Sequence, residues 1–141
     1  MIKIAPLSII AGGNYFADIL PISTHWLVWD KLQTMPTFSD CELFWTNSPR
    51  KSVKKYTVQW NGLLGKELHQ ERVHPTQKPE KLFSLIIQDY SSDGQTILDP
   101  FAGSGTTLRA AKNLRRKSIG IEREEKYCKE IVKRLRQEVL L

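Results

Sequence analysis

Short apolar runs and longer helical patterns alternate along the chain. Apolar or β-branched runs bounded by turn residues predict strands at about 7–11, 25–29, 42–46, 56–60, 96–99 and 118–121. Apolar side chains recur at helical spacing over about 79–90 and 124–139, and a brief helix is expected over 14–20, ended by Pro21. Helices placed between strands in this way predict an α/β fold with a layered sheet.

A basic loop separates two of the predicted strands. The runs at 42–46 and 56–60 are typical of an antiparallel pair, joined here by residues 47–55. Four cations lie close together in this connection: Arg50, Lys51, Lys54 and Lys55. They could neutralise the phosphates of a nucleic acid, or they could simply be the charges of a solvated loop tip, and the pattern leaves both readings open. The lysines and arginines of the last helix are better explained as a solvated helix face.

Aromatic residues are concentrated in the first half of the chain. The four tryptophans lie at strand spacing among other apolar residues, so we expect core packing for Trp26, Trp29, Trp45 and Trp60. Tyr15 and Phe16 follow a Gly-Gly turn and are better candidates for lining a cofactor or base pocket.

Residues 97–107 combine the end of a buried strand, a glycine turn and the start of a helix. Gly103 and Gly105 allow the backbone to approach a ligand closely, and the helix that begins at Thr106 directs its free N–H groups and positive dipole end at the loop. Asp99 at the end of the strand repels phosphate but attracts an ammonium group. The pattern therefore predicts a ligand that carries an amine, such as the methionine part of S-adenosylmethionine.

A second predicted strand, 117–121, is followed by Glu122, seventeen positions beyond Gly105. This spacing is typical of a βαβ unit in which the carboxylate after the second strand binds the ribose hydroxyls of an adenosine. Leu108 stands where a dinucleotide fingerprint has its third glycine. A nucleotide-dependent oxidoreductase is therefore a weaker alternative.

Composition limits the remaining choices. A chain of 141 residues with 40% apolar and 26% charged residues is typical of one soluble domain. Its 21 basic and 15 acidic side chains leave a net charge of +6, which favours a polyanionic partner or a merely basic surface. Cys41 and Cys128 are expected to be buried thiols, and the His and Cys spacings predict no metal site. Because neither a membrane-spanning run nor a secretion signal is recognisable, a cytoplasmic location is expected.

Two motifs resemble a known family. Residues 99–107, Asp-Pro-Phe-Ala-Gly-Ser-Gly-Thr-Thr, and residues 74–79, His-Pro-Thr-Gln-Lys-Pro, are similar to motifs of the DNA amino-methyltransferases that modify adenine N6 or cytosine N4. The likeness is to the permuted subgroup with its cofactor loop near the C-terminus, and it extends to residues 12–16, 26–31 and 41–46. The resemblance implies a Rossmann-like methyltransferase sheet, circularly permuted and incomplete. One domain, 1–141, is expected, with middle strands and the basic loop in 1–73 and a cofactor-binding half in 74–141.

The same resemblance assigns residues to S-adenosylmethionine. The loop and the start of its helix would hold the methionine part through Asp99, Pro100, Phe101, Gly103, Ser104, Gly105, Thr106 and Thr107. Glu122 would bind the ribose, and the cofactor's carboxylate end would lie beside Thr76, Gln77 and Lys78. The alternatives are a helix-capping or turn carboxylate for Asp99 and, for Glu122, a surface ion pair with Arg123 or Lys126.

The family's catalytic tetrapeptide, an Asp, Asn or Ser followed by Pro-Pro and an aromatic residue, occurs nowhere in the sequence and would be expected upstream of residue 1. No catalytic residue is therefore assigned. The resemblance implies a fragment or shortened member of these methyltransferases, with adenine N6 favoured over cytosine N4 and activity of the chain alone in doubt. The expected partners are double-stranded DNA and either a second polypeptide carrying the catalytic segment or another copy of this chain. The alternative is a non-catalytic DNA-binding or cofactor-binding module.

Overall fold

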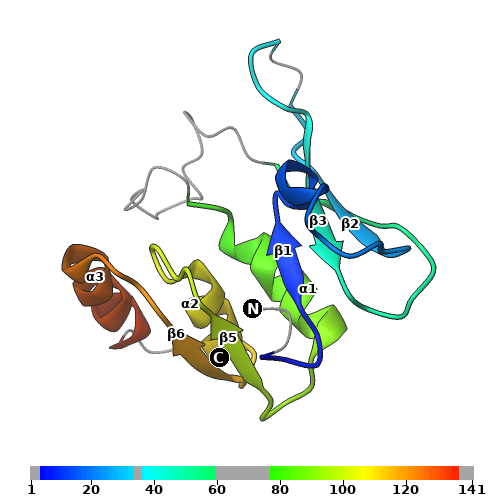
Figure 1. The fold of residues 1–141 in the computed structure, drawn as a ribbon. Coiled ribbons are helices and arrows are strands. Elements are labelled where there is room, and N and C mark those ends of the chain that lie inside the picture. Colours follow the sequence, from blue (N-terminus) through cyan, green and yellow to red (C-terminus); the bar gives the residue numbers. More distant parts are fainter. Residues whose placement is uncertain (1–3, 34–35, 60–76, 137–141) are drawn as a thin grey trace. The chain divides into compact units, whose positions relative to one another are not determined.

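A computed structural model describes residues 4–33, 36–59 and 77–136, which fall into two compact units, Met1–Leu63 and Leu64–Leu141 (Figure 1). Each unit is described by itself. The predicted division at 73/74 lies outside the described residues and stays a prediction. No helix within the described ranges has the length and apolar character needed to cross a membrane.

The first unit is a four-stranded mixed sheet. Its elements are β1 (Ile9–Ala11), the 3-10 helix η1 (Gly13–Phe16), β2 (Trp26–Asp30), β3 (Cys41–Thr46) and β4 (Lys54–Thr57). The strand order is β1-β3-β2-β4, with β3 antiparallel to β1 and β2, and β4 parallel to β2. In place of the helix expected over 14–20, the structure has only the short 3-10 helix η1.

The predicted antiparallel pairing of 42–46 with 56–60 is wrong, because β2 lies between β3 and β4. The connection from Thr46 passes the start of β2, where polar side chains bind its backbone. Ser23 Oγ donates to Thr46 O at 2.5 Å, Thr24 Oγ1 donates to Arg50 O at 3.2 Å, and His25 Nδ1 bonds Ser52 O. These contacts hold the basic loop across the start of β2, and the chain then forms β4 on the side of β2 opposite to β3.

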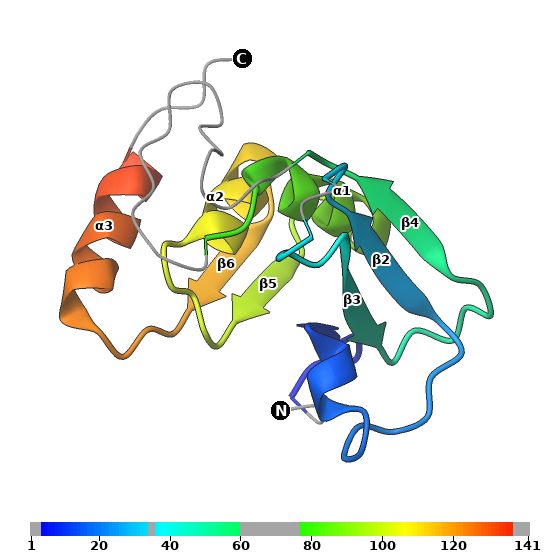
Figure 2. The same cartoon turned by 90° about the horizontal axis from the view of Figure 1, so that it is seen from above.

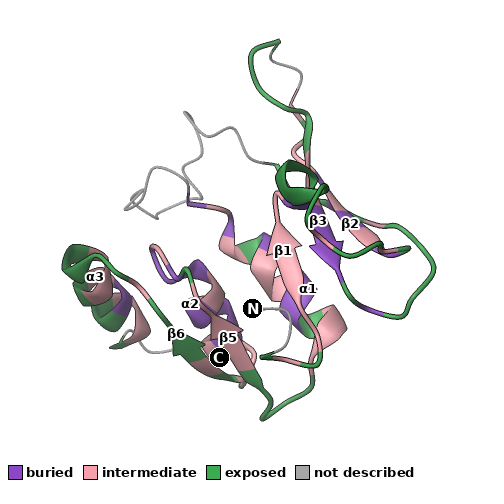
Figure 3. Cartoon of the chain, viewed as in Figure 1, coloured by how far each residue is buried: buried purple, intermediate pink, exposed green. Residues whose placement is uncertain are grey.

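Two tryptophans form the centre of the first unit's core, as expected. Figure 3 colours the ribbon by burial and shows buried residues on β3. Trp29 and Trp45 are each 1% exposed, and their indole N–H groups donate to Val58 O and Pro21 O, both at 2.8 Å. Trp26 is half-buried, and Trp60 lies outside the described residues. The expectation of buried thiols is wrong for Cys41, which is exposed because it begins β3 at the end of the sheet. Cys128 is half-buried.

The second unit is built on a βαβ element. It contains α1 (Glu80–Tyr90), β5 (Thr96–Asp99), α2 (Thr106–Asn113), β6 (Lys117–Gly120) and α3 (Glu125–Arg136). The strands β5 and β6 are parallel and are connected through α2, which packs on both (Figure 2). Ile87 of α1 packs against Ala110 and Ala111 of α2, while Leu108 of α2 meets Ile131 of α3.

Arg116 caps the ends of two helices in this unit. Its guanidinium donates to Ser91 O at 2.8 Å, at the end of α1, and to Leu114 O at 2.6 Å, at the end of α2. It also pairs with Asp93 at 2.6 Å, and its side chain is only 8% exposed. Arg115 pairs with the same carboxylate at 3.1 Å, but its side chain is 84% exposed.

These neighbouring arginines provide a matched test of the cap. We expect Arg116→Gln to lower the free energy of unfolding by about 2 kcal/mol, because two partly buried carbonyls lose a charged donor. Arg115→Gln is expected to cost less than about 1 kcal/mol, as an exposed ion pair does. Urea unfolding of both variants measures the difference, and equal losses would contradict the capping role.

Candidate functional site

The glycine loop between β5 and α2 is the best-defined candidate site. Gly103 and Gly105 have φ angles of 52° and 76°, and Gly105 is the residue that caps the N-terminus of α2. The loop closes through Gly105 N–H, which donates to Ala102 O at 2.7 Å. A β-carbon on Gly105 would lie 2.8 Å from Ile131 Cγ1. The loop therefore needs glycine at position 105 for its backbone conformation and also for its contact with α3.

Asp99 ends β5 at the carboxyl edge of the parallel pair. Its Oδ1 accepts a hydrogen bond from Phe101 N–H at 3.1 Å, which is the turn-carboxylate arrangement considered from the sequence. Its backbone oxygen accepts from Ile121 N–H at 2.9 Å and so extends the contact with the chain beyond β6. An ionised carboxylate has about four acceptor positions, so the turn bond leaves capacity for a ligand's ammonium group.

Glu122 lies two residues beyond β6 and bonds the glycine loop directly. Its Oε2 accepts from Gly103 N–H at 2.8 Å, and its Oε1 accepts from Glu124 N–H at 2.9 Å. Arg123, one of the ion-pair partners considered from the sequence, pairs with Glu124 at 3.3 Å. The carboxylate of Glu122, which was expected to bind a cofactor's ribose, thus also helps to hold the glycine loop in place.

The other loop residues differ in how far they are accessible. Ser104 and Thr106 are each 6% exposed, and their hydroxyls lie 3.1 Å apart, so they shape the loop from inside. Phe101 is 73% exposed, whereas Pro100 and Thr107 are half-buried. A ligand at this edge would meet the Phe101 ring and the N–H groups at the start of α2.

The segment before α1 is only partly described. Thr76 lies outside the described residues, Gln77 is 8% exposed and Lys78 is half-buried. Both precede Pro79, the extended N-cap residue of α1.

The four basic residues do not form a single cluster. Arg50 and Lys51 are exposed in the connection before β4, whereas Lys54 and Lys55 are consecutive in that strand and so face opposite sides of the sheet. The Lys54 ammonium lies 5.4 Å from the centre of the Tyr56 ring, and Lys55 pairs with Asp30 at 3.2 Å. The hydrogen bond from Leu32 N–H and, after it in importance, the hydrogen bond from Lys55 lower the pKa of the Asp30 carboxyl.

Tyr15 and Phe16, the candidates for a pocket lining, are 77% and 45% exposed in the first unit. Their expected role stays a prediction. Over the described part of the chain, no group of three or more His, Cys, Asp or Glu residues could hold a metal ion.

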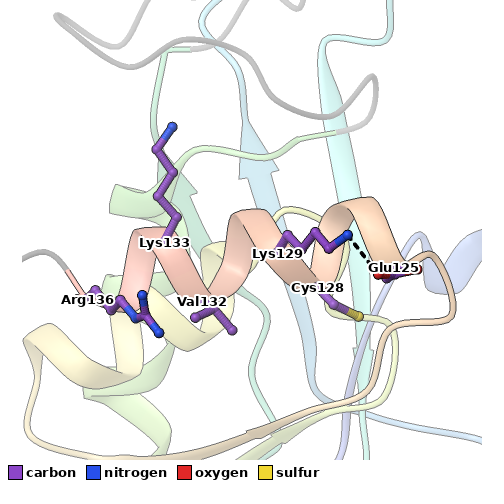
Figure 4. A pocket seen from close by; sticks show the side chains of 6 residues that line it. All are labelled: Glu125, Cys128, Lys129, Val132, Lys133 and Arg136. Carbon is purple, nitrogen blue, oxygen red and sulfur yellow. Dashed lines mark ion pairs between the residues drawn. The ribbon is translucent and has the colours of Figure 1, made fainter.

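A hollow on α3 is separate from the glycine loop (Figure 4). Six residues of this one helix line it: Glu125, Cys128, Lys129, Val132, Lys133 and Arg136. Glu125 pairs with Lys129 at 2.7 Å. Since none of the expected cofactor residues lines this hollow, it is not the predicted site.

Sequence reasoning missed Arg134, which contacts the glycine loop from α3. Its Nη1 donates to Ser104 O and to Thr106 Oγ1, both at 3.3 Å. The sequence could have pointed to Arg134 through its position in the helix, because it lies three residues after Ile131 and so next to the apolar face of α3.

Comparison with known proteins identifies the family. A family model described as DNA methylase, of the N6/N4 class, matches residues 20–133. The chain therefore belongs to the N6/N4 DNA methylase family, which confirms the resemblance found in its motifs.

Individual relatives agree with this assignment. The chain is 40% identical over 114 residues to the type II methyltransferase M2.DpnII of Streptococcus pneumoniae, and 33% identical over 138 residues to M.HinfI of Haemophilus influenzae. These matches cover 81% and 79% of the chain, but only 37% and 38% of the relatives. The M1.HpyAVI–SAM complex has a similar structure, with a TM-score of 0.64 and 30% identity, over 79% of this chain and 61% of that one. The chain thus matches only part of each relative's length.

Two glycines with nearly the same φ test the close approach of the loop to α3. Gly105→Ala is expected to lower the free energy of unfolding by about 2–4 kcal/mol, from left-handed strain and from crowding against Ile131. Gly94, with a φ of 78°, has no atom within 4 Å of an added β-carbon, so Gly94→Ala should cost only about 1 kcal/mol. Denaturant unfolding measures the loss of stability in each variant, and the difference between the two losses is the cost of crowding against Ile131. Equal losses would show that this crowding costs nothing.

Proposed function

We propose that this chain is the cofactor-binding part of a DNA methyltransferase that transfers a methyl group from S-adenosylmethionine to adenine N6 or cytosine N4. The observation that carries the proposal is the pair of acids at the glycine loop. Asp99 and Glu122 follow neighbouring parallel strands, and Glu122 bonds Gly103 N–H at 2.8 Å. Ligands of open α/β sheets bind at the carboxyl ends of parallel strands.

The methionine part of the cofactor carries an ammonium and a carboxylate group, and the loop offers a partner for each. Asp99 suits the ammonium group, whereas the positive end of α2 suits the carboxylate. The residues proposed to hold this part are Asp99, Pro100, Phe101, Gly103, Ser104, Gly105, Thr106 and Thr107, with Thr76, Gln77 and Lys78 beside its carboxylate. M1.HpyAVI, to which the chain is similar in structure, was solved as a SAM complex, which supports this choice of ligand.

Glu122 is proposed to bind the ribose of the same cofactor. Its two bonds to backbone N–H groups hold the carboxylate in place, and a carboxylate can accept several hydrogen bonds, as a pair of neighbouring hydroxyl donors requires. A ligand bound in this way would lie against the loop that Glu122 stabilises.

When bound, S-adenosylmethionine supplies an activated methyl group, so the protein's task is to align the acceptor amine with it. An exocyclic base amine is a poor nucleophile and needs hydrogen-bond acceptors once the base has left the duplex. The 141 residues contain no Pro-Pro pair to provide the family's acceptor segment. We therefore propose that this segment lies outside these residues, either in the same polypeptide or in a partner chain.

The basic loop of the first unit is the proposed contact with double-stranded DNA. Arg50 and Lys51 are exposed in the connection before β4, and this exposure is what supports a contact with phosphates. Lys54 could join them from the edge strand. A non-catalytic module remains the second candidate function, favoured by the lack of a Pro-Pro-aromatic segment in these residues.

Calorimetric titration with S-adenosylmethionine tests the proposed site. We expect Asp99→Asn and Glu122→Gln each to weaken binding about 10-fold to 100-fold, as expected when a charged hydrogen-bond acceptor is lost. Glu125→Gln is the matched control, because it removes the same charge from exposed α3 and should leave binding unchanged. Binding that is indifferent to both site variants would contradict the proposal.

Methyl transfer tests the need for a further segment. Incubated with labelled cofactor and unmethylated DNA, the chain alone is expected to transfer no methyl group, because it lacks the amine acceptors. Addition of a family polypeptide that carries the Pro-Pro-aromatic segment should restore transfer. Robust transfer by the 141 residues alone would refute this part of the proposal.

A further inference from the structure

The side chain of Arg134 connects three elements of the second unit. From α3 it reaches Ser104 O and Thr106 Oγ1 with one nitrogen, and Glu80 Oε2 with the other at 2.9 Å. Both partners of this ion pair have side chains only 15% exposed. The guanidinium therefore lies where the glycine loop, the start of α2 and the start of α1 meet.

Glu80 is held from a second direction. It is the first residue of α1, directly after Pro79, and its Oε1 accepts from Asn113 Nδ2 at 2.7 Å at the far end of α2. The carboxylate thus has a charged donor on one oxygen and an amide donor on the other. This arrangement fixes the position of α1's first turn relative to both ends of α2.

The backbone of α3 around Arg134 is also fastened. Arg109 Nη1 donates to Arg134 O at 3.0 Å, and Lys112 Nζ donates to Leu135 O. Ile131, one turn earlier, packs so closely against Gly105 that a methyl group would not fit. These contacts fix the distance between α3 and the glycine loop independently of the Arg134 side chain.

A partly buried ion pair is weak evidence for a stabilising role, because the desolvation of two charges offsets much of their attraction. The pair instead helps to position the glycine loop and places a positive charge near the start of α2. Arg134 donates to a peptide carbonyl of the loop and to the hydroxyl of α2's first residue, so it contacts the start of that helix directly. It also places a positive charge beside the end where a carboxylate is expected to bind.

We propose that Arg134 and Glu80 form a brace that orients the glycine loop relative to the segment 77–79, and thereby sets affinity for the methionine part of S-adenosylmethionine. The inference rests on the proposed function. Both residues are positioning residues, because they act through the loop and through the start of α1.

The test compares two ligands that share the adenosine part but differ in the amino-acid chain that the brace serves and in the sulfonium charge. Calorimetry measures binding of S-adenosylmethionine and of methylthioadenosine, which lacks the amino-acid chain. Arg134→Gln is expected to weaken binding of the full cofactor about 10-fold and binding of the fragment less than about 2-fold. Arg136→Gln is the control, since this arginine lies two residues away on the exposed face of α3 (Figure 4).

Two further variants keep the test independent of folding. Arg134→Lys retains the charge but loses the forked contact, so it should recover only part of the affinity. Glu80→Gln should reproduce the selective loss while retaining hydrogen-bonding capacity. Equal losses for both ligands, or no loss in any brace variant, would overturn the brace while the proposed function stands. Failure of the unaltered chain to bind the cofactor would overturn the proposed function and the brace with it.

Discussion

The close passage of the glycine loop between Glu122 and Ile131 is the constraint on which the second unit depends. On one side, Gly103 N–H bonds the carboxylate of Glu122, and on the other, Gly105 leaves no room for a β-carbon beside Ile131. These contacts attach α3 and the chain beyond β6 to the start of α2. A larger residue in the loop would therefore disturb the helix packing as well as the site.

The charges around this loop have opposite signs at short range. Asp99 and Glu122 place negative charge at the strand ends, while the start of α2 and Arg134 provide positive character nearby. Such an arrangement suits a ligand that carries both charges, and it disfavours a simple polyphosphate. The chemistry of the site thus agrees with the N6/N4 DNA methylase family to which the chain belongs.

The two units contribute different parts of the chain's candidate sites. The second contains the loop and both acids. The first contains a sheet in which the polar residues 23–25, directly before β2, hold a basic connection across the start of that strand. The chain spans only 37% and 38% of the curated relatives it matches.

The sequence by itself determined the elements that local pattern encodes: five of the six strands nearly in place, the long helices, the glycine turn and the two acids. It failed where the answer depended on residues far apart in the chain. Nothing local shows that β4 joins β2 instead of β3, because that choice depends on backbone contacts made by Ser23, Thr24 and His25. The exposure of Cys41 followed from its place in the register, and the part played by Arg134 followed from the packing of α3 against the loop. Periodicity reports which face of an element is buried, whereas only the tertiary structure decides which partner that face meets.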